Sequence, residues 1–436
     1  MVARNRSRTN YVKTLVELAE ALVEWENAPP TTVMHQPEHA SSQMPRRVKG
    51  AGGQFALPAE SVRSHHWLVE ELLDRHGLSE KFSPDYVGEK IDNILIDIVD
   101  SLTQERASTL LDELLASHDE YSKEHTVWVP VSGFEPPEEP VSLGAIIIKQ
   151  VDQEDLERIR SGADALFDRH GFGSEHPAIQ PISFLESQVA AVHTSVAEPH
   201  RARQRALDET RIVLDVIRYA IPWMYPRGTC VGLLHEVSSG VRVVPVLEED
   251  GPLAILEVET VGPLENIDLS ASSLNEMQEL GVFKILDVLA RAPKISAFEE
   301  AIARSVRWFG RMVESEREEE RLLSGIIALE TLCSKKGRGG SIQNQVAEGA
   351  ALIAADRLED RKYIKKRVKN FYSKRSAVSH GGETTIKPWD TSELMLVLHR
   401  IIMFSLDYRD KFREVGDLLD WLDDAKLQAA LETEKK

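Results

Sequence analysis

Arg375, Ser376 and His380 lie close together in the chain, directly before the glycine pair Gly381-Gly382. A histidine titrates near neutral pH and can act as a general base or a general acid. An arginine stays charged and offers a planar fork of N–H donors to phosphate oxygens. These residue types suit metal-independent RNA cleavage, in which the 2′-hydroxyl attacks the adjacent phosphorus and leaves a 2′,3′-cyclic phosphate and a 5′-hydroxyl.

The stretch that carries these residues, Arg361–Gly382, contains eight lysines and arginines and no acidic residue, in a chain of formal net charge −19. Its apolar residues recur at helical spacing, so one face can pack while the basic side chains face outward. The glycine pair is typical of a helix C-terminus. We expect the RNA backbone to be held by five lysines of this helix: Lys362, Lys365, Lys366, Lys369 and Lys374.

Helical geometry constrains how these residues meet. At about 100° per residue, Arg375 and His380 point roughly 140° apart on an unbroken helix. They converge only if the helix distorts near its end, or if a second copy of the chain completes the site. Ser376 and His380 share a face, with Tyr372 one turn earlier, so Ser376 is positioned to orient the imidazole.

The order Tyr372, Arg375-Ser376, His380-Gly381 resembles the Arg-x-x-x-x-His signature of HEPN domains, and most closely the Apea-like HEPN group of bacterial defence proteins. The segment LLSGIIALETLCS is similar to a second helix of that group. The line from Leu143-Gly144 to Glu154 looks like the start of the mixed segment that precedes its helical domain. The resemblance covers about 125–412.

This resemblance implies an all-α C-terminal bundle that works as a metal-independent endoribonuclease. The protein would be a regulated toxin or effector in antiphage defence or stress response, with no cofactor and no metal. It would act as a homodimer through the bundle, because one histidine per chain cannot readily serve as both base and acid. The alternative is a catalytically silent HEPN-like scaffold that binds RNA or a partner protein. Two positions differ from the family pattern, Gly349 where an arginine is common and Ser379 where an apolar residue is common.

Glu330 is the unusual residue of the LLSGIIALETLCS helix, an acid among apolar neighbours. A buried carboxylate needs a partner, and Arg375 is the obvious candidate. The alternative is that Glu330 lies at the rim of the bundle and meets water. The loop that follows, Lys335–Gly340, either presents backbone N–H groups to a phosphate or is a plain connection between helices.

Composition limits the remaining classes of function. The 436 residues contain no run of about 18 apolar residues, so no membrane span is expected. Cys230 and Cys333 are the only cysteines, which argues against a disulfide framework and favours the cytoplasm. The acidic balance excludes a general nucleic-acid coat but allows a local basic cleft. His35 and His39 have metal-ligand spacing, but Pro37 between them favours a solvated loop.

Hydrophobic periodicity predicts an α+β chain in three parts. Residues 1–124 form a helical region with a Pro/Gly-rich linker at about 27–58, and offer a place for a trigger or regulatory partner. Residues 125–265 form a mixed α/β domain, and residues 266–436 the HEPN-like bundle. In that bundle we expect one helix over Leu274–Arg291, and another that is capped by Asp390. A third possible function is ligand or peptide sensing by the first two parts.

Overall fold

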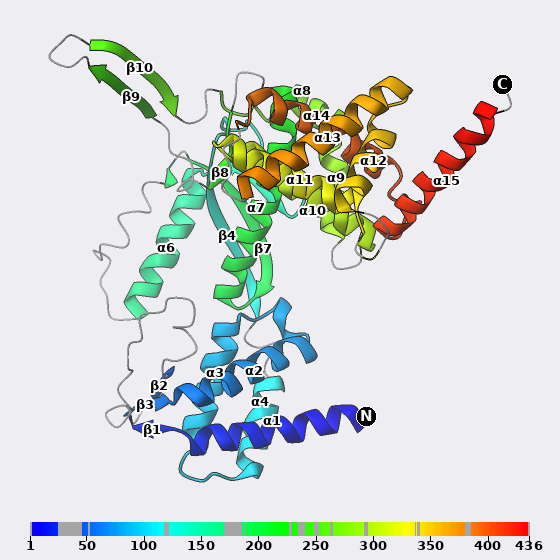
Figure 1. Ribbon diagram of the computed structural model, residues 1–436. Coiled ribbons are helices and arrows are strands. Elements are labelled where there is room, and N and C mark those ends of the chain that lie inside the picture. The colour runs from blue at the N-terminus through cyan, green and yellow to red at the C-terminus, as the bar shows by residue number, and fades with distance from the viewer. Residues whose placement is uncertain are drawn as a thin grey trace. The chain divides into compact units, whose positions relative to one another are not determined.

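The computed structural model describes residues 2–24, 46–50, 53–116, 122–169, 185–186, 188–225, 229–233, 240–247, 253–261, 265–291, 295–335, 337, 341–379 and 385–434. The fold class is mixed α+β, as predicted (Figure 1). The chain forms two compact units, Met1–Val127 with Thr194–Ala206, and Trp128–His193 with Leu207–Lys436. Most of the predicted α/β domain therefore shares a unit with the predicted C-terminal bundle.

The first unit is mainly helical and has its own apolar core, in which Leu15, Leu68 and Leu95 are fully buried. Residues 46–50 and 53–57 fell inside the predicted linker but form antiparallel strands, because Val48 and Leu57 are buried in this core. The sheet order is β1-β3-β2. The elements are α1 (Val2–Glu20), β1 (Val23–Glu24), β2 (Arg46–Gly50), β3 (Gly53–Leu57), α2 (Ala59–Arg75), the 3₁₀ turn η3 (Leu78–Glu80), α3 (Pro84–Ile98) and α4 (Gln104–Ala116).

A five-stranded sheet of order β5-β6-β7-β4-β8 lies mostly within the part of the chain that was predicted to be mixed α/β. Along β7 most residues are buried, and β6 alternates between buried and exposed positions, as expected of strands with one covered face. A separate antiparallel pair is formed by β9 and β10. The elements are β4 (Lys123–Ser132), β5 (Val141–Leu143), β6 (Ile146–Gln150), α6 (Gln153–Arg169), β7 (Val189–Ala197), α7 (Pro199–Met224), β8 (Gly232–Leu233), β9 (Gly240–Leu247) and β10 (Leu253–Val261).

The helices of the C-terminal part follow in short succession, and two predictions about them were wrong. The helix expected over Leu274–Arg291 is divided by Gly281, whose φ of 80° is left-handed and ends the first segment. The later helix begins at Pro388 with Lys387 as its N-cap, so Asp390 lies in the first turn, where its carboxylate accepts from the backbone N–H of Lys387. The elements are α8 (Ala271–Glu279), α9 (Val282–Ala290), α10 (Ala297–Glu314), α11 (Glu318–Cys333), α12 (Ile342–Ala354), α13 (Leu358–Ser379), α14 (Pro388–Asp407) and α15 (Val415–Glu434).

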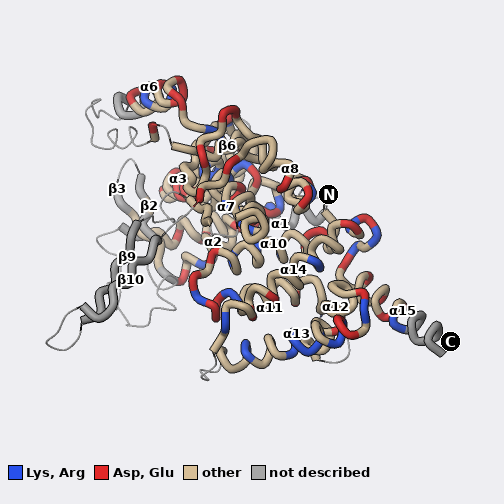
Figure 2. The backbone as a smooth tube through the Cα atoms, turned by 90° about the horizontal axis from the view of Figure 1, so that it is seen from above, with Lys and Arg blue, Asp and Glu red and all other residues tan. Residues whose placement is uncertain are grey.

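Helix α11 is the centre of this helical part, since it packs against α10, α12, α13 and α14. Gly325 makes the close approach possible, because a Cβ there would lie 2.6 Å from a methyl group of Leu394 and 2.8 Å from the sulfur of Met312. Figure 2 shows α13 beside α11 and α12, with Lys and Arg along its length. This packing brings the segments around Glu330 and Arg375 together.

Candidate functional site

Local features of the sequence explain helix α13, which begins at Leu358, three residues before the predicted stretch. Glu359 and Asp360 lie in its first turn, where negative charge is favourable against the helix dipole. Ile364, Val368 and Phe371 are buried and make one continuous apolar face. The helix ends at Ser379, just before the predicted glycine stop.

Glu330 on α11 accepts hydrogen bonds from two residues of α13 through the same carboxylate oxygen. The Nη1 of Arg375 lies 2.6 Å from Glu330 Oε1, and the hydroxyl of Tyr372 lies 2.9 Å from it. The predicted Glu330–Arg375 pair is therefore present. The rim alternative is also partly correct, because the Glu330 side chain is 24% exposed and that of Arg375 is 33% exposed.

Tyr372 completes this triad of α11 and α13. Burial, followed by the nearby charge of Glu330, raises the pKa of its phenol, so the hydroxyl keeps its proton and donates it to the carboxylate. The guanidinium of Arg375 also lies 5.8 Å from the centre of the Tyr372 ring, within cation–π range. Two contacts thus fix the arginine, and among the described residues no acceptor bonds to the rest of its N–H donors.

Ser376 is exposed on α13, one residue after the arginine. His380 lies outside the described residues, as do Gly381 and Gly382, and so does the side chain of Ser379. Both alternatives for bringing Arg375 and His380 together, a distorted helix end or a second chain, therefore stay predictions.

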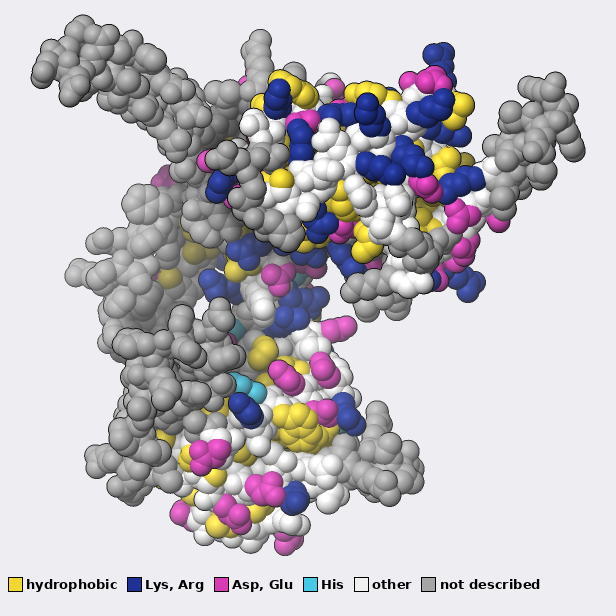
Figure 3. Space-filling model, in the orientation of Figure 1, with side chains coloured by type: hydrophobic (Ala, Val, Ile, Leu, Met, Phe, Trp, Pro, Cys, Tyr) yellow, Lys and Arg dark blue, Asp and Glu magenta, His cyan; other side chains and the backbone are white. Residues whose placement is uncertain are grey.

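The five predicted RNA-binding lysines divide into two groups. Lys366 and Lys369 have no carboxylate partner within the described part of the chain. The other three form ion pairs: Lys362 with Glu359 at 2.8 Å, Lys365 with Glu348 at 2.7 Å, and Lys374 with Asp390 at 2.5 Å. In Figure 3, dark-blue side chains gather where α12 and α13 lie in Figure 1, with magenta carboxylates among them. The helix is thus less free to bind phosphate than its sequence suggested.

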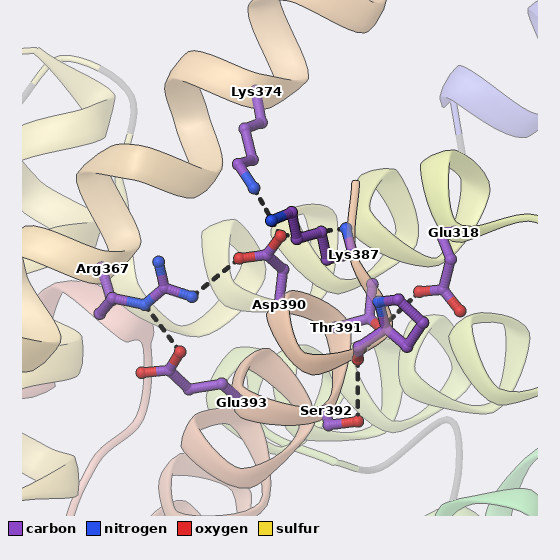
Figure 4. A network of polar contacts seen from close by, with 9 residues as sticks. Glu318, Arg367, Lys374, Lys387, Asp390, Thr391, Ser392 and Glu393 are labelled. Atoms are coloured by element: carbon purple, nitrogen blue, oxygen red, sulfur yellow. Dashed lines mark hydrogen bonds and ion pairs between the residues drawn. The ribbon is translucent and has the colours of Figure 1, made fainter. Parts of the chain in front are cut away.

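Asp390 is a residue whose role the sequence analysis missed. It is 1% exposed and accepts from Lys374 and, at 2.8 Å, from Arg367, both on α13 (Figure 4). Burial opposes its ionisation, but the hydrogen bonds from Lys374 and Arg367 outweigh burial and lower the pKa of the carboxyl. Arg367 also binds Glu393 at 2.7 Å. This cluster joins α13 to the start of α14. In the sequence, its only signal was the i, i+7 spacing of Arg367 and Lys374.

Gly349 is one of the two positions at which the sequence differs from the HEPN pattern that it resembles. It is buried on α12, and a Cβ at this position would lie 3.4 Å from the Cβ of Cys333 on α11. A Cβ at that distance would make an ordinary van der Waals contact, so this position of α12 faces α11.

Of the predicted phosphate loop Lys335–Gly340, only Lys335 and Gly337 lie within the described residues. Lys335 pairs with Glu414 at 2.7 Å, so its charge is used within the chain. Residues 336 and 338–340 of the predicted phosphate loop lie outside the described residues, as do His35 and His39. Within the described ranges, no three His, Cys, Asp or Glu side chains gather closely enough to hold a metal ion.

His399 on α14 is a second histidine of the helical part, and the sequence analysis did not single it out. Its Nδ1 lies 2.7 Å from the hydroxyl of Tyr219, and the ring of Trp223 lies 4.6 Å from its own. Burial, with the charge of Arg400, lowers the pKa of the imidazole, which favours the neutral form. These contacts explain His399 as a packed residue of the α7–α14 contact.

In comparisons with models of protein families, with curated proteins and with solved structures, none matches this chain. The HEPN resemblance therefore depends on the motifs and on the geometry around them. None of the described helices is both long and apolar enough to cross a lipid bilayer.

Proposed function

We propose that the chain is a metal-independent endoribonuclease of the HEPN type, and that it acts as a regulated toxin or effector in antiphage defence or stress response. The observation that carries this proposal is the Glu330–Arg375–Tyr372 triad. It holds a charged guanidinium, one third exposed, one turn of helix before the predicted histidine. A group held by two contacts before substrate arrives is what electrostatic catalysis requires.

In the proposed reaction His380 transfers protons, and Arg375 stabilises the negative charge on the phosphoryl oxygens. One imidazole takes the proton from the 2′-hydroxyl, whose oxygen attacks the phosphorus, and a second imidazole protonates the departing 5′-oxygen. The free N–H donors of Arg375 stabilise the phosphoryl oxygens as negative charge gathers on them. Ser376, exposed beside Arg375, orients the imidazole.

The need for two imidazoles supports the proposal of a homodimer through the C-terminal helices. Each chain supplies one His380 and one Arg375 to a shared cleft. In this arrangement the two residues need not converge within one helix, which agrees with the angle of roughly 140° expected between them on an unbroken helix. A partner or trigger that acts on the helical N-terminal unit would then control how the two copies meet.

Growth and RNA integrity in cells test this proposal. Expression of the wild type should slow growth and yield RNA fragments with 5′-hydroxyl ends, whereas His380→Ala and Arg375→Ala should have neither effect. His66→Ala, which removes an exposed histidine of α2, should behave like the wild type. Toxicity that survives His380→Ala unchanged would place the activity elsewhere in the chain.

The ion pairs of Lys365 and Lys374 favour one second candidate, a catalytically silent scaffold. A lysine that is already paired with a carboxylate between helices binds an RNA phosphate less strongly, because the carboxylate neutralises its charge. RNA or protein binding that persists in the His380→Ala variant, with no cleavage by either protein, would establish the scaffold function.

A further inference from the structure

A pocket of about 480 Å³ lies beside the triad, between α10, α11 and the start of α15. Glu330 lines it, together with Trp308, Arg304 and Lys335. Arg375 and Tyr372 both bond to Oε1 of Glu330, and among the described residues no donor is bonded to Oε2. One carboxylate therefore belongs both to the candidate site and to the wall of this pocket.

The charges of the pocket do not suit a phosphate group. Arg304 is paired with Glu300 at 2.6 Å, and Lys335 with Glu414 at 2.7 Å. Glu330 has its own partner in Arg375, so each charged group that lines the pocket is already paired. A phosphate would meet no unpaired cation among these lining residues, whereas a neutral group with N–H donors would meet carboxylate acceptors.

Trp308 supplies a flat apolar surface in the same wall. Its indole is half-buried, and the guanidinium of Arg311 lies 4.7 Å from the ring centre, which holds the ring by a cation–π contact. Arg311 is exposed and, within the described ranges, has no carboxylate partner. Aromatic rings bind the bases of single-stranded RNA by stacking, and a nearby arginine can contact the backbone.

We infer that this pocket is a base-binding subsite of the proposed nuclease and that it prefers guanine. The inference rests on the proposed function for its role in cleavage. Guanine is the RNA base whose Watson–Crick edge has two adjacent N–H donors, N1–H and the N2 amino group, so it gains most from the free oxygen of Glu330. Adenine and cytosine place a ring-nitrogen acceptor beside their amino group, and that acceptor would face the carboxylate. The base stacks on Trp308, and its phosphate lies at Arg311.

Binding of the four ribonucleoside monophosphates tests the subsite without requiring cleavage. GMP should bind the full-length wild type most tightly, and Trp308→Ala should weaken GMP binding by about tenfold or more. Trp389→Ala is the matched control, because Trp389 is 60% exposed on α14 and lies outside the pocket. Trp308→Phe should retain most of the GMP binding, since it keeps a stacking ring. GMP should quench less of the tryptophan fluorescence of this variant than of the wild type, because the indole of residue 308 is gone.

Equal affinity for all four nucleotides, no binding, or the same GMP affinity in the Trp308→Ala variant as in the wild type would overturn the inference. Cleavage of oligouridine that carries a single G, A or C then separates the subsite from the nuclease. GMP binding without any RNA cleavage would refute the proposed function and leave the pocket. Cleavage without preference for the G-containing strand would refute the subsite and leave the nuclease.

Discussion

The guanidinium of Arg375 and the carboxylate of Glu330 are 2.6 Å apart although 45 residues separate them in the chain. The contact joins the last turns of α13 to the last turns of α11. The predicted catalytic residue His380 comes directly after α13 in the sequence. The pair is partly exposed, so its contribution to stability is about 1 kcal/mol or less. Its larger effect is to keep the arginine in one orientation.

Glu330→Gln should therefore reduce RNA cleavage much more than it reduces stability. The guanidinium loses its ionic partner and becomes mobile, which should lower turnover on the order of 10-fold to 100-fold, while the melting temperature changes little. Glu359→Gln removes the carboxylate of another α13 pair, with Lys362, and is the control. If both variants cleave at the wild-type rate, the Glu330–Arg375 pair has no part in the reaction.

The unpaired lysines of α13 should contribute most of its affinity for RNA. Lys366→Gln/Lys369→Gln should weaken binding for every sequence and reduce the salt dependence, with the slope falling by roughly 0.7 for each lost contact. Lys362→Gln/Lys365→Gln removes the same charge from the same helix, but from lysines bonded to Glu359 and Glu348, and should change the slope less. Binding titrations at several salt concentrations measure both slopes. Identical slopes for the wild type and both variants would mean that α13 does not contact RNA.

Asp390 should stabilise the contact between α13 and α14 in a pH-dependent way. Its pKa is lower in the folded protein than its ordinary value of 3.8, so its stabilisation is full above pH 3.8 and is lost as the pH falls through the folded-state pKa. Asp390→Asn should cost about 3 kcal/mol at pH 7, because Lys374 and Arg367 lose a buried partner. The difference from the wild type should narrow in acid.

Urea unfolding at pH 7 and below pH 3.8 measures this difference. Asp407→Asn, which removes an exposed partner of Lys284, should cost less than about 1 kcal/mol at either pH. A loss in Asp390→Asn that is independent of pH would show that the charge of Asp390 does not matter.

The sequence predicted the helices near the site well, because their signals are local. The apolar stripe of Ile364, Val368 and Phe371 indicated the face of α13 that packs, and it is buried. An acid in the apolar run around Glu330 required a partner, and Arg375 is that partner. Local signals fail where a turn decides the outcome, as at Gly281, where two short helices take the place of one.

The charge of the α13 surface could not be predicted, because it depends on contacts between distant segments. Lys365 and Lys374 are basic residues in a stretch without acids, yet Glu348 and Asp390 reach them from α12 and α14. The pocket beside Glu330 was missed for the same reason, since Trp308 and Lys335 come from different helices or their ends. Spacing along one helix carries no information about the neighbours that another helix supplies.

A shared site predicts complementation between two inactive chains. Arg375→Ala and His380→Ala proteins should each be inactive, and mixing them after dissociation should restore only part of the cleavage, because the shared cleft of a mixed dimer keeps one Arg375 and one His380 but lacks the second imidazole. The protein should sediment as a dimer. A monodisperse monomer that cleaves RNA at the wild-type rate would exclude the shared site.

The most direct test of the proposed mechanism is cleavage of a single-stranded RNA by the purified protein in excess EDTA. The wild type should cleave it and leave 2′,3′-cyclic phosphate ends, and His380→Ala should lower turnover by a factor on the order of 10²–10⁴ while RNA binding stays nearly unchanged. Cleavage that stops in EDTA and returns with magnesium, or that proceeds at the same rate in His380→Ala, would contradict the mechanism.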